Sequence, residues 1–217
     1  MEKAKIDLRD TKRKLLADLS GRLYPLGFKT LSGEIFTRAG DDGWAVSLSL
    51  ESRMQAGLLI CTPAVRATRS DISHLIEAGM GPYWQHPRWK RSASHAVFAK
   101  SLIDMAGIGA NPEGMLDFKC ADAATIARAA KQIEAAVKSC IDEIEMLGAT
   151  PGVLKLLRKE RRNLPSRYIR EIAAVLFAEG RHRVLMNFIK GLELGVTSPL
   201  DRKFFKYLMK LSRHGDE

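Results

Sequence analysis

The sequence predicts an α+β fold, in which strands are grouped together and helices lie outside that group. Three observations predict it. Apolar and polar residues alternate over 44–51, the period of a strand with one buried face. Apolar residues recur at three- and four-residue steps over 122–147, which is typical of a long amphipathic helix. After Pro151 only helical patterns follow, so we expect an antiparallel sheet with a long helix and then a subdomain of helical hairpins.

The first third of the chain reads as one helix followed by strands. Leucines at near-helical spacing predict an N-terminal helix over 3–22, which Pro25 and Gly27 end. Gly and Asp residues at 40–43 indicate a turn between strands. We expect three strands joined as an antiparallel meander and then a second helix, at 34–38, 44–51, 58–62 and 70–79.

The rest of the chain is mainly helical. The segment 95–104 fits a buried strand or a short helix, and we favour the strand; 115–119 is expected to be an edge strand. Gly148 ends the long helix. Further helices are predicted at 152–162, at 166–179 with Ser166 as its cap, from 182 onward, and from Ser198-Pro199 to the C-terminal region. We therefore divide the chain into an α+β domain, 1–148, and a basic all-helical subdomain, 149–217.

Charge is unevenly distributed along this chain of 217 residues. Its composition, 46% hydrophobic and 28% charged, is that of an ordinary globular protein, and its net charge is +10. Residues 1–150 hold 20 Lys and Arg against 18 Asp and Glu, whereas residues 151–217 hold 15 against 7. A basic C-terminal module favours an anionic partner, although a solvated helical surface that happens to use Lys and Arg is an equally open interpretation.

Several classes of protein are not expected. The first residues mix charges without an apolar run, and the longest apolar stretch, 173–178, is too short to span a bilayer, so we predict a cytoplasmic protein without a membrane partner. Neither histidines nor cysteines have metal-ligand spacing, and no nucleophile elbow or glycine-rich phosphate loop is present. We predict no catalytic residues, no metal and no cofactor. The cysteines are expected to be buried apolar residues: Cys61, Cys120 and Cys140.

An aromatic and basic segment at 83–91 is the first candidate binding site. Aromatic rings interleaved with cations suit single-stranded nucleic acid, and Trp and Arg also dominate the energetics of protein interfaces. Alternatively, both indoles turn inward and close one end of the sheet. The candidate partner-binding residues of this segment are Trp84, Arg88, Trp89, Lys90 and Arg91.

Two cationic ridges on predicted helices are the second candidate. Lys155, Arg158, Lys159 and Arg162 share one face of the helix after Pro151, opposite its apolar residues. The last helix has a similar ridge of Arg202, Lys206, Lys210 and Arg213. Helix surfaces usually alternate charge sign, so the scarcity of acid on these faces favours an anionic partner over an ordinary solvated face.

The order of segments resembles a family. An N-terminal helix precedes Pro-Leu-Gly-Phe-Lys at 25–29 and the strand around Ile35 and Phe36; Trp44, the loop tryptophans and the long helix follow. This resembles bacterial α+β domains of unknown function found in polymorphic-toxin neighbourhoods, some of which are regarded as immunity proteins. The resemblance covers about residues 5–147 and implies binding and neutralisation of a toxin, with no catalytic residues. Inhibitors of nuclease toxins are often acidic, whereas this chain is basic, so the toxin surface is expected to be acidic.

The sequence thus predicts a non-catalytic cytoplasmic protein that binds one protein partner with an acidic surface, in the manner of an immunity protein. The alternative is a nucleic-acid-binding protein that uses the basic C-terminal helices.

Overall fold

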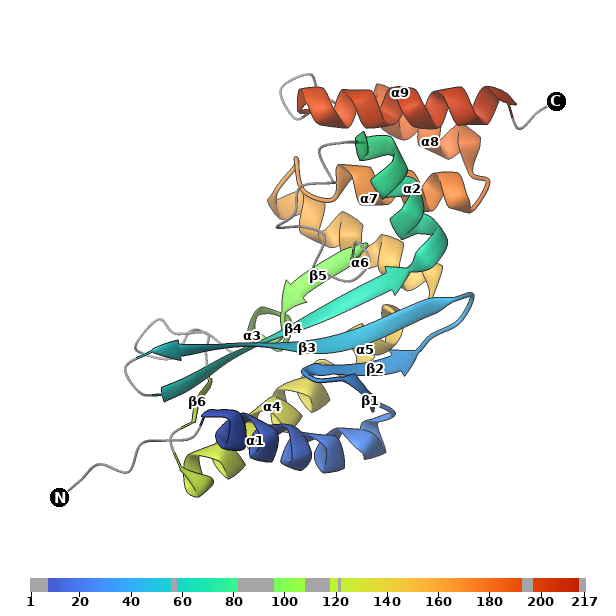
Figure 1. The fold of residues 1–217 in the computed structure, drawn as a ribbon. Helices are drawn as coiled ribbons and strands as arrows, with labels where there is room; N and C mark the ends of the chain where they lie inside the picture. The colour runs from blue at the N-terminus through green and yellow to red at the C-terminus, as the bar shows by residue number, and fades with distance from the viewer. Residues whose placement is uncertain are drawn as a thin grey trace. The chain divides into compact units, whose positions relative to one another are not determined.

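The computed structural model describes residues 8–55, 58–81, 96–107, 118–120, 122–192 and 197–214. The structure combines an antiparallel sheet with helices, most of which follow the strands in the chain, and this confirms the α+β class (Figure 1). The elements are α1 (Leu8–Leu23), η1 (Tyr24–Leu26), β1 (Lys29–Ser32), β2 (Ile35–Ala39), β3 (Trp44–Gln55), β4 (Leu58–Arg69), α2 (Ser70–Met80), β5 (Phe98–Ser101), α3 (Leu102–Met105), β6 (Phe118–Cys120), α4 (Ala123–Ser139), α5 (Ile141–Met146), α6 (Thr150–Asn163), α7 (Ile169–Ala178), α8 (His182–Lys190) and α9 (Pro199–His214).

The sheet has the strand order β1-β2-β3-β4-β5, and β6 pairs with β4. The pairs β1–β2, β2–β3 and β4–β6 are antiparallel. The register places Phe36 opposite Leu48, and both side chains are almost fully buried. The predicted meander is therefore present, with β1 as an additional strand that the sequence analysis did not anticipate. All four residues of β1 are exposed, so it has no alternating pattern to reveal it.

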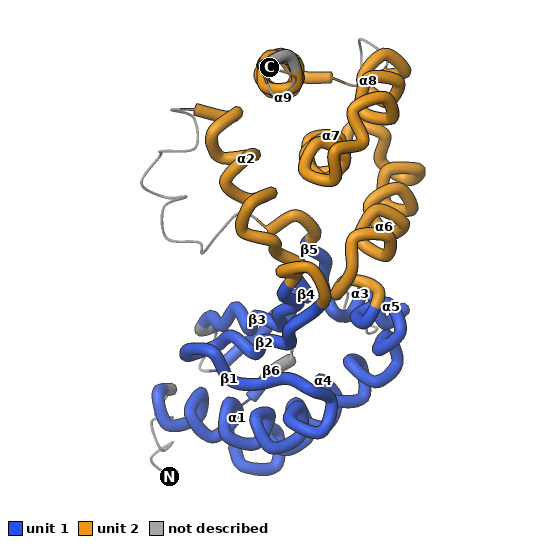
Figure 2. Tube along the Cα trace, turned by 90° about the vertical axis from the view of Figure 1, so that its right-hand side faces the viewer, with its two compact units in different colours: residues 1–40, 45–66, 99–145 blue, residues 41–44, 67–98, 146–217 orange. Residues whose placement is uncertain are grey.

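Contacts divide the chain into two compact units, coloured blue and orange in Figure 2. Unit 1 comprises residues 1–40, 45–66 and 99–145, and unit 2 comprises 41–44, 67–98 and 146–217. The boundary at residue 148 remains a prediction about domains. The contacts group the turn 41–44 and α2 with the C-terminal helices.

In unit 1, α1 and α4 lie side by side and pack on one face of the sheet (Figure 2). Leu15, Leu19 and Leu23 of α1 are buried, as their spacing predicts. α4 begins with a capping box in which the Asp122 carboxylate accepts from the backbone N–H of Thr125 at 2.8 Å. This box fixes the start of the long predicted helix where the sequence placed it.

The predicted helix over 122–147 is divided into α4 and α5 at Cys140. The prediction of one continuous helix was therefore wrong. The break is not caused by Gly or Pro, because neither occurs at this position. The Ser139 hydroxyl and the Cys140 thiol both donate to the carbonyl of Ala136, at 2.9 and 3.2 Å. Side chains that bond back to the preceding turn bend a helix, and Cys140 is buried at the bend.

In unit 2, α7 is the central helix and contacts α2, α6, α8 and α9. Five consecutive residues of α7, 172–176, are fully buried, because a helix surrounded by neighbours has no solvent face. Gly79 of α2 permits close packing on α9: a Cβ there would collide with the Phe204 ring and lie 2.8 Å from that of Tyr207. Phe204 and Leu208 are buried beneath α2 and α7.

The predictions for two helix starts and for one ambiguous segment have different outcomes in the structure. Ser198 and Asp201 cap α9 as predicted, since each side chain accepts from the other's backbone N–H, at 2.8 and 3.1 Å. Ser166 does not cap α7, which begins after Tyr168 in a left-handed conformation with φ 60°. The ambiguous segment 95–104 combines both interpretations, because β5 runs directly into α3. No helix within the described ranges is long and apolar enough to cross a membrane.

Candidate binding surface

Helix α6 positions the first ridge of cations. Pro151 stands in its first turn, where its missing N–H is not needed. Gly152 lets that turn approach closely, because a Cβ would collide with the Met146 carbonyl. Val153 and Leu157 are fully buried, and Leu154 and Leu156 nearly so. The helix ends before Pro165. Because its apolar residues are buried, the residues on the opposite side point outward.

The side chains predicted as a ridge on α6 do lie together at the surface. Lys155, Arg158, Lys159 and Arg162 are all exposed, on the side opposite the buried leucines. From Lys155 to Arg162 the ridge extends about 10 Å along the helix axis, given the rise of 1.5 Å per residue. On α9, Arg202, Lys206 and Lys210 are likewise exposed, and Arg202 donates to the Thr197 carbonyl at 2.7 Å.

Within the described residues of α6 to α9, the carboxylates lie mostly away from the outer face. Between Thr150 and Leu192 seven Lys and Arg residues are exposed. The three acids of that range are Glu160 and Glu171, which are buried, and Glu179, which is paired with Arg69 at 2.6 Å. Glu160 faces the Arg167 guanidinium at 3.8 Å. The acids thus lie inward or are already paired, and the outer face of this region is positive.

The other predicted segment is outside the described residues. Trp84, Arg88, Trp89, Lys90 and Arg91 all fall within 82–95, so their grouping remains a prediction. The structure therefore brings together one of the two predicted sites.

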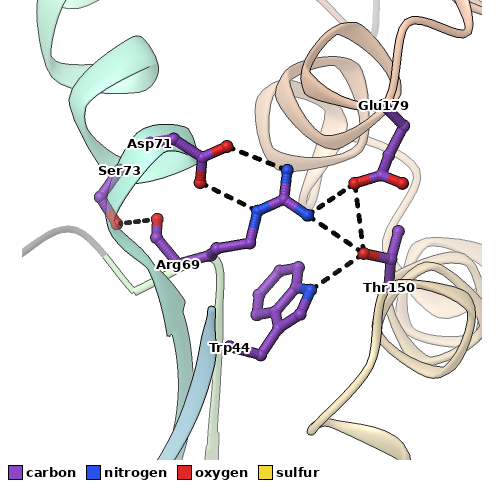
Figure 3. Close-up of polar contacts among 6 residues, drawn as sticks. All are labelled: Trp44, Arg69, Asp71, Ser73, Thr150 and Glu179. Atoms are coloured by element: carbon purple, nitrogen blue, oxygen red, sulfur yellow. Dashed lines mark hydrogen bonds and ion pairs between the residues drawn. The ribbon is translucent and has the colours of Figure 1, made fainter. Parts of the chain in front are cut away.

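A polar network around Arg69, shown in Figure 3, was missed by the sequence analysis. Arg69 ends β4, and its guanidinium binds both oxygens of Asp71, at 2.9 and 3.0 Å. Its Nη1 donates to Glu179 at 2.6 Å and to the Thr150 hydroxyl at 3.2 Å. The indole N–H of Trp44 donates to the same hydroxyl at 2.9 Å, and the guanidinium carbon lies 5.5 Å from the Trp44 ring centroid.

This network connects four segments of unit 2: the first residue of β3, the β4–α2 junction, the start of α6 and the end of α7. Burial opposes ionisation of Asp71, but the hydrogen bonds from Arg69 outweigh it and lower the pKa of that carboxyl. Burial likewise opposes the charge on Arg69, but Asp71 and Glu179 raise its pKa. All three nitrogens of the guanidinium are thus engaged, so the network holds the helices in place. No spacing in the sequence links Trp44, Thr150 and Glu179.

The cysteines are buried and free, as predicted. Cys61 and Cys120 lie on the paired strands β4 and β6. A hydrogen bond between their side chains raises the pKa of Cys61 and lowers that of Cys120. Burial raises the pKa of Cys140 to about 11. Among the described residues, no three His, Cys, Asp or Glu side chains are grouped so that they could hold a metal ion.

Comparison of the chain with models of known families, with curated proteins and with solved structures found no match.

Proposed function

We propose that this protein is a non-catalytic binding protein whose partner is a protein with an acidic surface. The observation that carries the proposal is the exposed ridge of Lys155, Arg158, Lys159 and Arg162 on a helix whose carboxylate is buried. A surface of one charge sign attracts a partner of the other and speeds their encounter.

The acids of α6 to α9 support this proposal by their positions. Asp201 binds Arg170 at 2.9 Å and caps α9, and Glu179 binds Arg69. These carboxylates stabilise the packing of helices, whereas Lys155, Arg158 and Arg162 are exposed on the outer face of α6. Charges at a surface add little to stability, so a set of them with one sign is better explained by a partner than by folding.

The identity of that partner as a toxin is a separate part of the proposal. It rests on the resemblance of residues 5–147 to domains found in toxin neighbourhoods. In that case the protein would act in the cytoplasm, and the ridge would supply the electrostatic part of toxin recognition.

Nucleic acid is the second candidate, because four cations within two helical turns could contact successive phosphates. Phosphate binding releases counterions, so affinity would fall steeply with added salt. A protein partner with a mixed interface would show a weaker dependence on salt.

Crosslinking of the protein in its native cell, followed by identification of the captured proteins, tests the proposal. The double variant Lys155→Glu, Arg158→Glu reverses two ridge charges, and Arg128→Glu, Lys131→Glu is the matched control, an exposed pair at the same spacing on α4. We expect a captured protein that the ridge variant loses and the control retains, with an affinity for the purified ridge variant about tenfold lower or worse, since each 1.4 kcal/mol is a factor of ten.

Nuclease treatment before capture separates the two candidates. If the difference between ridge variant and control disappears after nuclease digestion, nucleic acid is the partner and the proposal is wrong. The toxin part is tested by expressing the captured protein alone, which should arrest growth, and with this chain, which should restore it. Growth arrest that persists on co-expression contradicts neutralisation but leaves the binding proposal intact.

A further inference from the structure

Apolar side chains lie exposed close to the ridge. Leu164, just after α6, is 53% exposed, and Val184 of α8 is 37% exposed. α8 is loosely covered: of its nine residues only Leu185 is buried, and Phe188 and Ile189 are half-buried. Val184 and Phe188 are four residues apart and so lie on one face of the helix.

Arg161 connects this apolar face to the end of α6. Its guanidinium carbon lies 5.1 Å from the centroid of the Phe188 ring, and its Nε donates to the Pro165 carbonyl at 3.3 Å. These two contacts bring α8 and the turn at Leu164 to the same side chain. A cation stacked on an aromatic ring is attracted to it and loses rotamer freedom before any partner arrives.

The helices that carry the apolar face are rich in exposed cations. Arg158 and Arg162 of α6 are exposed, as are Arg181, Arg183 and Lys190 around α8. The sequence of α8 contains no acid, and the one acid of α6, Glu160, is buried. A partner segment on this face would therefore meet apolar contacts at the centre and cations at the rim.

We infer that Arg158, Arg161, Arg162, Leu164, Val184 and Phe188, the α6–α8 patch, form the docking surface for an acidic segment of a partner protein that also carries an apolar anchor. This inference rests on the proposed function and specifies the partner's chemistry. Interfaces combine an apolar centre with a polar rim, and aromatic residues and Arg are enriched in them. Nucleic-acid surfaces are strongly polar and charged, so exposed Leu and Val contribute little to phosphate binding.

Fluorescence anisotropy with a labelled peptide tests the inference on the full chain. The probe is a short peptide with Leu at three- and four-residue spacing and Glu at the other positions. The comparison probes are the same peptide with Gln in place of Glu, the same peptide with Ser in place of Leu, and a single-stranded DNA of equal charge. We expect the acidic, leucine-containing peptide to bind about tenfold or more tightly than each of the others, a margin that one lost anchor can produce.

The variants Val184→Asp and Leu164→Asp should each weaken that binding about tenfold, because each places a carboxylate where the partner's acid or anchor lies. Leu31→Asp is the matched control, the same apolar-to-acidic change at a 67% exposed leucine of β1 in unit 1, and it should bind as the unaltered chain does. Circular dichroism and thermal unfolding establish that all three variants are folded. Both test positions are exposed, so failure to fold is not expected.

Three results would overturn the inference. The first is absence of binding at millimolar peptide. The second is equal binding of the Gln peptide, which would remove the requirement for acid. The third is equal binding of the Ser peptide or the DNA, or unchanged binding by both Asp variants. Equal binding of the Ser peptide, or unchanged binding by both Asp variants, leaves the ridge as a purely electrostatic surface, so the proposed function would survive while the α6–α8 patch would not. Equal binding of the DNA would overturn the patch and favour the nucleic-acid alternative.

Discussion

The two units of this chain place their carboxylates differently. In unit 1, exposed or partly exposed acids pair with cations of neighbouring elements, as in Lys12–Glu34 at 2.5 Å, Arg38–Glu145 at 3.1 Å and Arg22–Glu134 at 3.0 Å. In helices α6 to α9 of unit 2, the described acids are either buried or, like Glu179, bound to Arg69. The positive surface of unit 2 therefore arises as much from where its acids lie as from its cations.

Charge counts over the two units agree with this difference. Unit 1 contains 16 Lys and Arg against 14 Asp and Glu, and unit 2 contains 19 against 11. The surplus of unit 2 lies in residues 146–217, which hold 15 Lys and Arg against 7 Asp and Glu, whereas its earlier segments hold four of each. We expect the buried or paired carboxylates of unit 2 to govern the free energy of unfolding, and its exposed cations to govern binding of the partner. Variants can separate these two roles.

The largest effect is expected at the centre of the Arg69 network. Trp44→Ala removes a side chain that is 2% exposed and donates to Thr150. Loss of a buried Trp lowers the free energy of unfolding by about 3–5 kcal/mol. Chemical denaturation measures this loss. Trp44→Phe retains most of the packing and should be about 1 kcal/mol less stable than the unaltered chain. A loss below 1 kcal/mol for Trp44→Ala would contradict the central role of the network.

Arg69→Met should lower the free energy of unfolding by about 2–3 kcal/mol, because it removes the buried guanidinium that binds Asp71, Glu179 and Thr150. Arg38→Met is the matched variant in unit 1, where the pair with Glu145 is partly exposed, and should lose less than about 1 kcal/mol. Equilibrium denaturation of both variants compares the inward and outward pairs. Equal losses would erase the distinction between the units.

The acid limb of the stability curve should depend on Asp71. Its pKa is lowered in the folded state, so its ionisation stabilises the fold above the ordinary carboxyl pKa of about 3.9, and this contribution is lost as the pH falls below that value. Asp71→Asn should therefore make the decline of stability below about pH 4 shallower. In the Arg69→Met background the same substitution should change the slope little, since the cause of the shift is gone. An identical change in both backgrounds would assign the effect to another group.

The smallest effect on stability is expected at the ridge. Lys155→Glu, Arg158→Glu should change the free energy of unfolding by no more than about 0.5 kcal/mol, because exposed charges away from special features are nearly neutral. The measurement is thermal or chemical unfolding beside the α4 control pair Arg128→Glu, Lys131→Glu. A loss of several kcal/mol would show that the ridge serves the fold itself, and binding losses in this variant could then no longer be attributed to an interface.

Local patterns predicted the elements well where a periodic face or a cap was present. The meander, α2, the capped start of α9 and the cationic face of α6 all follow from side-chain period and turn residues. β4 continues past Pro63 to Arg69 because the chain finds further pairing beyond it, where Val97 donates to the Ala67 carbonyl at 2.9 Å. The break at Cys140 and the left-handed Tyr168 likewise depend on packing that no local pattern reports.

The sequence by itself determined the fold class, the orientation of α6 and hence the exposure of Lys155, Arg158, Lys159 and Arg162, since an apolar stripe on a helix dictates its outer face. Only the tertiary structure decided which distant residues meet: Arg69 with Trp44, Thr150 and Glu179, and Arg161 with Phe188. Helix period is a local property that a short window contains. Pairing between residues up to 110 positions apart depends on how whole helices pack, and no short window contains that.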